Sequence, residues 1–529
     1  MDPTQSTTGE QKEMNSILPP EMINCISHYL DTRDFLSLRS TCKDYYRALT
    51  DNVIVKLLPR QVSHYFRMKD AFRDNIERGC PVVVDCSIMG SGKTYVSCAL
   101  CVELKLEPIV FCPKTAKSVW FDAFQVFGLT GEVETYARLR GRNRYLVNGQ
   151  ATAEWEQKVK NGVMLIYDEC QNLKNATAQF KCALALATAI YDQNRSCMLM
   201  LSATPADKLE QVVRYCRLLG IMRNDQIAHQ NLQTGEYVLD GFREIINFCV
   251  KDQNKREILV ESVNKATKHH VLMTLFTKYI KSIFFFAMKP PEIDAELDIK
   301  NGFYKMSVKG QEELREAVDR LRRAIAVFMS MSQRRSSTMA FRDIGLSIAG
   351  IEKAKLEIFC RQALLALNDR EKPNQKVICM FSHLTPIFVL AKVLQAYNPL
   401  VLTGKNTDSQ RQAVMHYFKH SPNHRLLIGN ITVMALGISL HDTIGDSPRV
   451  CLISPSYHVM NLHQASRRAY REGSKSDTIV RYVYGSDQMA ECSMLNSIAK
   501  KCSVMRTLTT QAVGENVKYP SEHEKYIES

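Results

Sequence analysis

Short runs of consecutive apolar residues alternate with amphipathic stretches over much of the chain. The first block of such runs lies between residues 55 and 222, at 82–85, 108–112, 163–167 and 197–201. A short run in which every side chain is apolar indicates a strand buried on both faces, as in a parallel sheet. Because a helical stretch follows each run, residues 55–222 are predicted to form a doubly wound α/β domain.

A second block of the same kind covers residues 351–505. Its apolar runs lie at 377–381, 399–402, 425–429, 449–453 and 478–482. Residues 223–350, between the blocks, are basic and helical in pattern, and residues 506–529 are expected to be a tail. The predicted fold class is therefore α/β, with two tandem parallel-sheet domains, a helical insertion and a small N-terminal helical segment. Because the first apolar run, at 82–85, leads into a Gly-Ser-Gly-Lys-Thr loop at 90–94, the two domains are predicted to be of the recombinase-like (P-loop NTPase) type.

The first 52 residues differ from the rest. Residues 1–15 are polar and predicted to be disordered. Residues 16–52 contain a leucine-proline start, a helical stretch, a Leu-Asp-x-x-Asp-Phe-Leu turn at 30–36 and a Leu-Arg-x-Thr-Cys-Lys segment at 38–43. This order resembles an F-box, a resemblance that implies docking on a Skp-type ubiquitin-ligase adaptor. A small helical cap packed on the α/β core is the alternative.

The charge balance is the informative part of the composition. The chain has 45% hydrophobic residues, as is usual for globular proteins, but 69 Lys and Arg against 55 Asp and Glu give a formal net charge of +14. An excess of this kind favours a polyanionic partner such as nucleic acid. We find no apolar run of 18 residues and no leader, and Cys98 and Cys101 have no second pair at zinc spacing. We therefore expect an intracellular protein without a membrane span.

Residues 82–100 contain the strongest chemical signal. A buried strand is followed by Met89-Gly90-Ser91-Gly92-Lys93-Thr94 and then by a helix. In a phosphate-binding loop, glycines let backbone N–H groups converge on phosphate oxygens, a lysine contacts the terminal phosphates, and a hydroxyl coordinates Mg²⁺. Ser87 stands where the full pattern has its first glycine. A flexible turn that contains a lysine by chance is the alternative.

Three further segments provide the other parts of an ATP-hydrolysing site. Asp168 and Glu169 end an apolar strand, where the aspartate can hold Mg²⁺ through water and the glutamate can polarise the attacking water. Ser202-Ala203-Thr204 follow the next strand, and their hydroxyls can bond the Asp-Glu segment. Arg468 and Arg471 have the spacing that places two side chains on one face of a helix. A surface Asp-Glu pair, a Pro-containing turn and a solvated basic helix face are the respective alternatives.

The order of these segments resembles helicase superfamily two, and most closely its Swi/Snf-type branch of DNA-dependent ATPases. The similar segments lie at 57–61, 108–128, 376–394, 402–418, 426–440 and 454–501, so that the resemblance covers roughly residues 55–505. The divergent motifs resemble a large-DNA-virus member. The resemblance implies a nuclear location, or a cytoplasmic viral factory or virion for a viral protein.

The resemblance also implies a role for each matching residue, with ATP and Mg²⁺ as cofactors. The implied catalytic residues are Lys93, Asp168, Glu169, Arg468 and Arg471, the two arginines acting as arginine fingers. The implied nucleotide contacts are Gln61, which recognises adenine, together with Met89, Gly90, Ser91, Gly92, Lys93, Thr94 and Gln464. Thr94 and Asp168 are the implied Mg²⁺ ligands. Contacts to nucleic-acid phosphates are expected from Lys114, Thr115, Thr403, Gly404, Asn430 and Thr432.

Four segments depart from the Swi/Snf-type pattern: Cys170-Gln171, Ser202–Thr204, Ser474 and residues 284–293. These departures concern coupling and accessory contacts more than hydrolysis. The sequence therefore predicts an ATP-dependent motor that translocates on double-stranded DNA. A helicase that separates DNA or RNA strands is one alternative. An F-box adaptor that uses the ATPase fold only as a binding platform is another.

Overall fold

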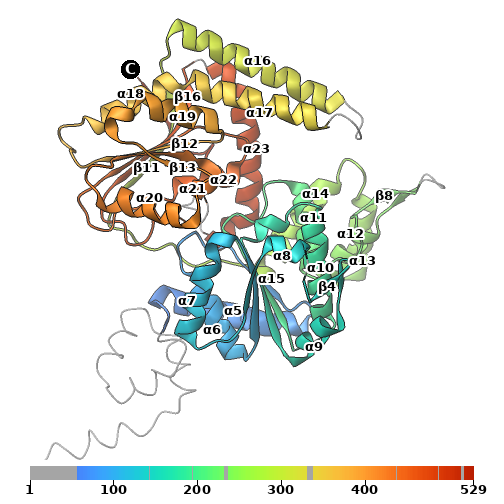
Figure 1. Cartoon of the computed structure of the whole chain (residues 1–529). Coiled ribbons are helices and arrows are strands. Elements are labelled where there is room, and N and C mark those ends of the chain that lie inside the picture. Colours follow the sequence, from blue (N-terminus) through green and yellow to red (C-terminus); the bar gives the residue numbers. More distant parts are fainter. Residues whose placement is uncertain are drawn as a thin grey trace, which may run out of the picture.

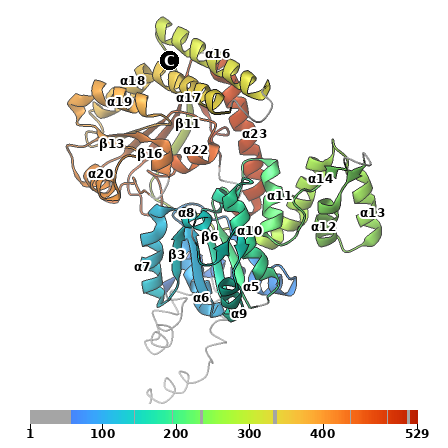
Figure 2. The same ribbon diagram turned by 45° about the vertical axis from the view of Figure 1, so that its right-hand side comes forward.

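The computed structural model describes residues 56–528, except for 142, 194, 232–235, 331–336, 436–437, 487 and 514–517. The expected tail at 1–15 and the F-box-like segment at 16–52 lie outside the described residues. The described chain forms two α/β domains that lie one above the other in Figures 1 and 2. Of the helices that the structure describes, none has the length and apolar character needed to cross a lipid bilayer.

The first domain is built on a parallel six-stranded sheet with the order β10-β1-β7-β6-β2-β3. Its strands are β1 (Val82–Asp85), β2 (Glu107–Cys112), β3 (Glu132–Thr135), β6 (Val163–Asp168), β7 (Cys197–Leu201) and β10 (Phe285–Phe286). The four strands predicted between residues 55 and 222 are thus confirmed.

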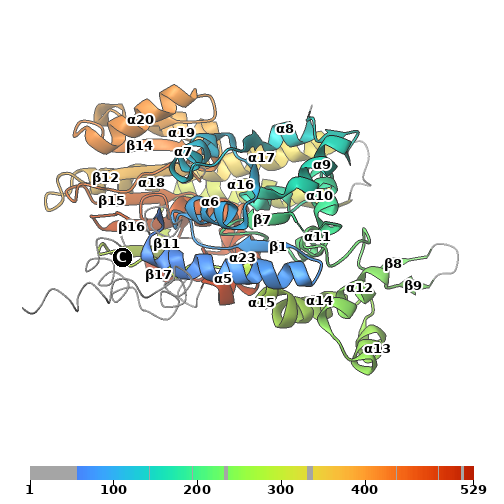
Figure 3. The same cartoon turned by 90° about the horizontal axis from the view of Figure 1, so that it is seen from below.

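Helices cover both faces of this sheet because alternate side chains of a strand point to opposite sides. Val83 of β1 packs with α5 (Pro59–Glu77), α6 (Lys93–Leu104) and α7 (Lys117–Phe127). Its neighbours Val82 and Val84 pack in the other core, with α9 (Ala153–Asn161), α10 (Ala178–Tyr191) and α11 (Leu209–Leu218). Figure 3 shows α5 and α6 next to β1.

Smaller elements surround the first sheet. They are η3 (Lys114–Ala116), α8 (Tyr136–Arg140), β4 (Leu146–Val147), β5 (Gln150–Ala151), η4 (Cys170–Leu173), β8 (His229–Gln230), β9 (Tyr237–Val238), α12 (Asp240–Cys249), α13 (Gln253–Ser262), α14 (Lys268–Leu275), η5 (Phe276–Ile280) and α15 (Lys281–Phe284). The β8–β9 hairpin and α12 to α14 form an arm on one side of the domain (Figure 3).

The second domain has a parallel seven-stranded sheet with the order β13-β14-β12-β15-β16-β11-β17. Its strands are β11 (Leu297–Tyr304), β12 (Lys376–Phe381), β13 (Leu400–Leu402), β14 (Leu426–Asn430), β15 (Arg449–Ile453), β16 (Thr478–Gly485) and β17 (Lys525–Ile527). Its helical elements are α16 (Val308–Ser330), α17 (Ser337–Ala354), α18 (Leu356–Leu367), α19 (Leu384–Val393), η6 (Gln395–Tyr397), α20 (Asp408–His420), α21 (Ile431–Ala435) and α22 (Val459–Ser466). The five strands predicted for this block are confirmed.

Two regions differ from the sequence-based expectation. Residues 223–350 are not purely helical, because β10 joins the first sheet and β11 joins the second. Residues 506–529 are not simply a tail, because α23 (Gln488–Val513) continues into them and β17 pairs with β11. The strands β10 and β17 are too short to produce a periodic pattern, and Asn301 and Gly302 interrupt the apolar character of β11.

Helix α23 connects the two domains along their side (Figures 1 and 2). Its residues Met494, Ile498 and Cys502 belong to the core of the second domain, whereas Leu508 belongs to a core of the first. The buried ammonium of Lys281, in α15, donates to the Thr507 carbonyl over 2.8 Å. The carboxyl ends of strands from both sheets can therefore face a common cleft.

Candidate nucleotide site between the two domains

The loop between β1 and α6 has the backbone conformation of a phosphate cradle. Gly90 and Gly92 adopt positive φ angles of 78° and 85°, in the region that favours glycine. α6 begins at Lys93, so its first N–H groups point toward the loop. The Lys93 ammonium donates to the carbonyls of Ser87 and Ile88 over 2.8 and 3.2 Å. The lysine thus lies folded over the loop where phosphate oxygens can replace those carbonyls as acceptors.

Ser87, which replaces the first glycine of the full pattern, uses its hydroxyl for two contacts. The hydroxyl donates to the Asp85 carboxylate and accepts a hydrogen bond from the Met288 backbone N–H over 2.8 Å. Met288 belongs to the divergent segment 284–293. A departure from the phosphate-loop pattern and a departure from the Swi/Snf-type pattern are therefore neighbours in space. The serine fixes the start of the loop to the chain that leaves the first domain.

The acidic segment lies at the carboxyl end of β6, two strands from β1 in the sheet. Burial and the neighbouring Glu169 raise the pKa of Asp168 to about 6, although Trp120 and Lys93 oppose the shift. Asp85 at the end of β1 and Asp168 at the end of β6 both pair with Leu201 of β7, so the aspartate lies at the same edge of the sheet as the phosphate loop. Glu169 has a positive φ of 55°, which turns the chain sharply after the strand.

Gln171 links Glu169 to the segment after β7. Its amide donates to Glu169 Oε2 over 2.8 Å, and its Oε1 accepts from the Ser202 hydroxyl over 2.6 Å. The Ser202 hydroxyl in turn accepts from the Thr204 N–H over 3.0 Å. The predicted bond between the Ser-Ala-Thr segment and the acidic segment is present, with the glutamine as its intermediate.

Arg468 and Arg471 of the second domain contact the phosphate loop of the first. Arg468 Nη2 lies 3.4 Å from Met89 Sδ. A Cβ atom built on Gly90 would lie 2.8 Å from Arg471 Nη2, so the Arg471 guanidinium covers the Gly90 turn. Burial lowers the pKa of Arg471, and it lowers the pKa of Arg468 to about 10 against the opposing effect of Glu169. Such buried positive charge is stabilised by an anion in the cleft.

The prediction that the two arginines share a helix face is wrong. α22 ends at Ser466, and the segment from Arg467 onward forms turns and bends. Carbonyls of Ala435 and Ile438 accept hydrogen bonds from Arg468, and the Ser474 hydroxyl accepts one from the Arg471 backbone N–H over 3.0 Å. The loop is thus held by long-range contacts that helical periodicity does not reveal.

The two predicted glutamines differ in position. Gln61, at the start of α5, donates to the Ser91 carbonyl over 3.0 Å, and a Cβ built on Gly92 would collide with its Nε2. It therefore lies against the phosphate loop. Gln464 is buried in α22, and the structure gives its Nε2 no hydrogen-bond partner within the described residues. No contact between Gln464 and the loop is present among the described interactions.

Three contacts of this site have no signature in the sequence motifs. Arg60, beside Gln61, forms a bidentate ion pair with Glu472, beside Arg471, and so joins the two domains. His64 Nε2 lies 3.2 Å from Asp85 Oδ2, both buried beneath the phosphate loop. The Trp120 indole donates to Asp168 Oδ2 over 2.9 Å. Each contact joins residues from different elements, so only the fold reveals it.

The residues present fit a Mg²⁺–nucleotide. Two positive-φ glycines form a loop that side chains at those positions would fill, and Lys93, Arg468 and Arg471 provide positive charge around it. Buried polar atoms without a described partner also follow the strands of both sheets: Thr204 Oγ1, Ser382 Oγ and Ser454 Oγ. Mg²⁺ typically takes few protein ligands and retains phosphate oxygens and waters, which Thr94 and Asp168 would complete.

The expected nucleic-acid contacts lie on both domains. Lys114 is exposed and pairs with Asp408 of the second domain over 2.9 Å. Thr403 is buried, and its hydroxyl bonds Asn406 at 3.2 Å, whereas a Cβ on Gly404 would meet only open space. Asn430 donates to the Ser382 carbonyl over 2.8 Å, and Thr432 accepts from Asn461 over 3.4 Å. Lys114, Gly404 and Thr432 are thus the exposed members of this set.

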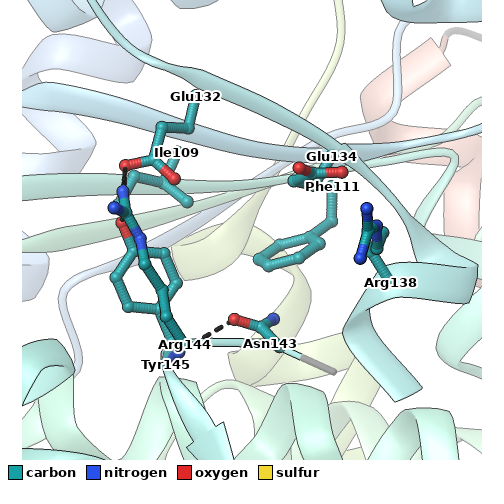
Figure 4. A pocket seen from close by; sticks show the side chains of 8 residues that line it. All are labelled: Ile109, Phe111, Glu132, Glu134, Arg138, Asn143, Arg144 and Tyr145. Carbon is teal, nitrogen blue, oxygen red and sulfur yellow. Dashed lines mark hydrogen bonds and ion pairs between the residues drawn. The ribbon is translucent and has the colours of Figure 1, made fainter. Parts of the chain in front are cut away.

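Two cavities differ in their relation to this site. A cavity of about 300 Å³ lies beside β2 and β3, with Phe111 between Arg138 and the Glu132–Arg144 ion pair (Figure 4). It contains none of the predicted site residues. A cavity of about 190 Å³ is lined by Met89 of the phosphate loop, Arg471 and the prolines at 290–291. The second cavity thus shares Met89 and Arg471 with the predicted site residues.

Comparisons with known proteins identify one family model, one relative in sequence and one similar solved structure. Residues 15–57 match the F-box domain model, which confirms the predicted N-terminal resemblance. The chain is 24% identical over 478 residues to "Putative ATP-dependent RNA helicase L364" of Acanthamoeba polyphaga mimivirus, covering 86% of this chain and 83% of the relative. The Sulfolobus solfataricus SWI2/SNF2 ATPase core in complex with dsDNA is 15% identical, with a TM-score of 0.31, over 87% of this chain and 97% of that structure. A TM-score this low does not establish a shared arrangement of the domains.

Proposed function

We propose that the protein is an ATP-dependent nucleic-acid motor that hydrolyses ATP between its two domains and moves along double-stranded DNA. The observation that supports this most strongly is the Arg471 guanidinium lying over the Gly90 turn, because a charge from one domain then faces the phosphate loop of the other. Similarity to a mimivirus protein named as an ATP-dependent RNA helicase supports the ATPase part.

The residues divide the reaction between the domains. Lys93 and the loop N–H groups hold the terminal phosphates. Thr94 and Asp168 would hold a Mg²⁺ ion, which would supply positive charge at the phosphate oxygens. Glu169 orients and polarises the attacking water. Gln171 holds the Glu169 carboxylate, and the Ser202 hydroxyl in turn holds Gln171. Arg468 and Arg471 stabilise the charge that develops on the transferring phosphoryl group.

Movement along DNA follows from the same division of residues between the two domains. ATP favours the closed arrangement because both domains contact the triphosphate, and hydrolysis removes that bridge. Two of the expected phosphate contacts, Lys114 and Gly404, are exposed and lie on different domains, so opening changes the spacing between them. Contacts of this type are independent of base sequence and weaken with salt.

ATP turnover with and without nucleic acid tests this proposal. The purified chain is assayed alone and with duplex DNA, single-stranded DNA and RNA, beside Glu169→Gln. Duplex DNA is expected to stimulate turnover most, and Glu169→Gln to lower kcat by about 10²–10⁴-fold, the range for loss of a general base. Greatest stimulation by RNA would support a strand-separating RNA helicase instead. Lack of stimulation by any of them would contradict the motor.

The F-box match favours a second function, recruitment of a Skp-type adaptor through residues 15–57. We expect the full chain to co-purify with such an adaptor and to lose it on deletion of 16–52. Lys93→Ala is the control, because it damages the ATP site without touching the F-box. Failure of the intact chain to bind the adaptor would contradict this function and leave the motor unaffected.

A further inference from the structure

Trp120 lies at an unusual place for a buried tryptophan. It belongs to α7, its side chain is 0% exposed, and its indole N–H donates to Asp168 Oδ2 over 2.9 Å. The Asp168 carbonyl is also held, because it accepts from the Tyr136 hydroxyl over 2.8 Å. Phe124 packs against the indole edge at a centroid distance of 6.1 Å. Both ends of Asp168 are therefore fixed by neighbouring elements.

The chemistry of the indole suits a metal-binding carboxylate. An indole N–H can only donate, so it neither competes for Mg²⁺ nor changes tautomer, as a histidine would. A donor on Oδ2 fixes the plane of the carboxylate and leaves Oδ1 able to accept from a metal-bound water. Partners of this kind orient metal ligands, and their removal typically lowers metal affinity.

We propose that Trp120 is a positioning residue for Asp168: its N–H sets the orientation in which this carboxylate holds Mg²⁺ at the nucleotide. The inference rests on the proposed function, since it takes Asp168 as the Mg²⁺ ligand. It adds a residue outside the predicted catalytic and binding sets, on a helix whose other face is exposed.

The other tryptophan of the chain is a matched control. Trp155, in α9, is also 0% exposed and also donates its indole N–H, to the Leu186 carbonyl over 3.0 Å. It packs in the core on the opposite face of the same sheet. Replacing either tryptophan by phenylalanine removes one buried N–H and keeps an aromatic ring, but only Trp120→Phe changes Asp168.

The first measurement is the Mg²⁺ concentration that gives half-maximal ATP turnover. Trp120→Phe is expected to raise it by about 10-fold, at the lower end of the range for such partners. Turnover at saturating Mg²⁺ should recover, because a positioning residue limits metal binding and takes no part in the reaction. Trp155→Phe should keep the wild-type value. An unchanged Mg²⁺ requirement in folded Trp120→Phe would overturn the proposal.

The second measurement is independent of turnover and of whether Trp120→Phe folds. In Trp155→Phe, Trp120 is the sole tryptophan, so its fluorescence reports on the Asp168 carboxylate. Addition of Mg²⁺ with ADP should change its emission, whereas ADP with EDTA should change it much less. Equal responses with and without Mg²⁺ would overturn the proposal. A Mg²⁺-specific response in a protein that hydrolyses no ATP would support Trp120 while refuting the motor.

Discussion

The two α/β domains have the same parallel architecture but differ in the loops at the carboxyl ends of their strands. In the first, β1 leads into a loop with two left-handed glycines, Gly90 and Gly92, that leaves backbone N–H groups open to an anion. Among the described residues of the second domain, no strand is followed by such a glycine pair. Its contribution to the cleft is the positive charge of Arg468 and Arg471. The first domain thus has a loop that can hold phosphate, and the second has positive charge that can contact the same phosphate.

Under the proposed function, this difference means that hydrolysis depends on how closely the domains approach each other. A phosphate loop alone binds a nucleotide, whereas the guanidinium groups lower the barrier only when the second domain contacts the loop. Variants of the first domain should therefore alter binding and turnover together. Variants of the arginines should alter turnover with little change in nucleotide affinity.

The largest expected effect is that of Arg471→Ala. We expect kcat to fall by about 10³-fold or more, because an arginine finger contributes about 10³–10⁵. Nucleotide affinity, measured by ADP titration, should change little. Arg361→Ala is the control, since Arg361 pairs with Glu528 at 2.7 Å, away from the cleft, in the same domain. Equal kcat values for the two variants would show that Arg471 takes no part in the reaction.

Gly90→Ala tests the contact between Arg471 and the Gly90 turn by a change in the first domain. A Cβ at Gly90 would collide with Arg471, and the misplacement of the guanidinium should cost about 10²-fold in turnover. Gly128→Ala has the same backbone strain, at a φ of 65°, with no atom within 4 Å of the new Cβ. Thermal unfolding should show a similar loss in both, about 1–2 kcal/mol. Comparable turnover in both variants would contradict the claim that turnover depends on the position of Arg471 over the Gly90 turn.

The pH dependence at limiting Mg²⁺ should show an effect of intermediate size. Asp168 must be ionised to hold Mg²⁺, and its pKa is raised to about 6, first by burial and then by Glu169. Turnover should therefore fall as the pH drops below about 6 and be restored above it. Saturating Mg²⁺ should move the midpoint of this fall in turnover to lower pH, because metal binding favours the ionised carboxylate. If the pH at which turnover falls does not change with the Mg²⁺ concentration, a group other than Asp168 causes the fall.

The smallest expected effect is that of the ion pair between Arg60 and Glu472. The two side chains are 20% and 36% exposed, so solvent screens their attraction, and the coupling should be below about 1 kcal/mol. A double-mutant cycle with Arg60→Ala and Glu472→Ala, measured on kcat/KM for ATP, gives this value. A coupling of zero would mean that the pair does not help to bring the domains together.

The sequence was sufficient for the local parts of this structure. Buried strands produce uninterrupted apolar runs, and the phosphate loop and the Asp168-Glu169 pair come directly after such strands, so they were predicted at the right places. The parts that depend on distant residues were not predicted. The short strands β10 and β17 give no periodic signal, and the arginine loop leaves its helix after Ser466 because of contacts with Ala435 and Ile438.

The same reasoning explains the missed side chains. Trp120 lies in the segment 108–128 that resembles the Swi/Snf-type pattern, but its partner Asp168 lies on another element, 48 residues along the chain. Arg60 and Glu472 are 412 residues apart. A pattern in the sequence can indicate which residues are buried or polar, but not which distant residue each one meets.

The central claim is that Arg471 acts on the transition state of hydrolysis from the second domain. The most direct test is the affinity for Mg²⁺·ADP with aluminium fluoride, a transition-state analogue, compared with the affinity for Mg²⁺·ADP alone. The wild-type chain should bind the analogue at least about 10²-fold more tightly, and Arg471→Ala should lose most of that preference while still binding ADP. An undiminished preference in Arg471→Ala would contradict the claim.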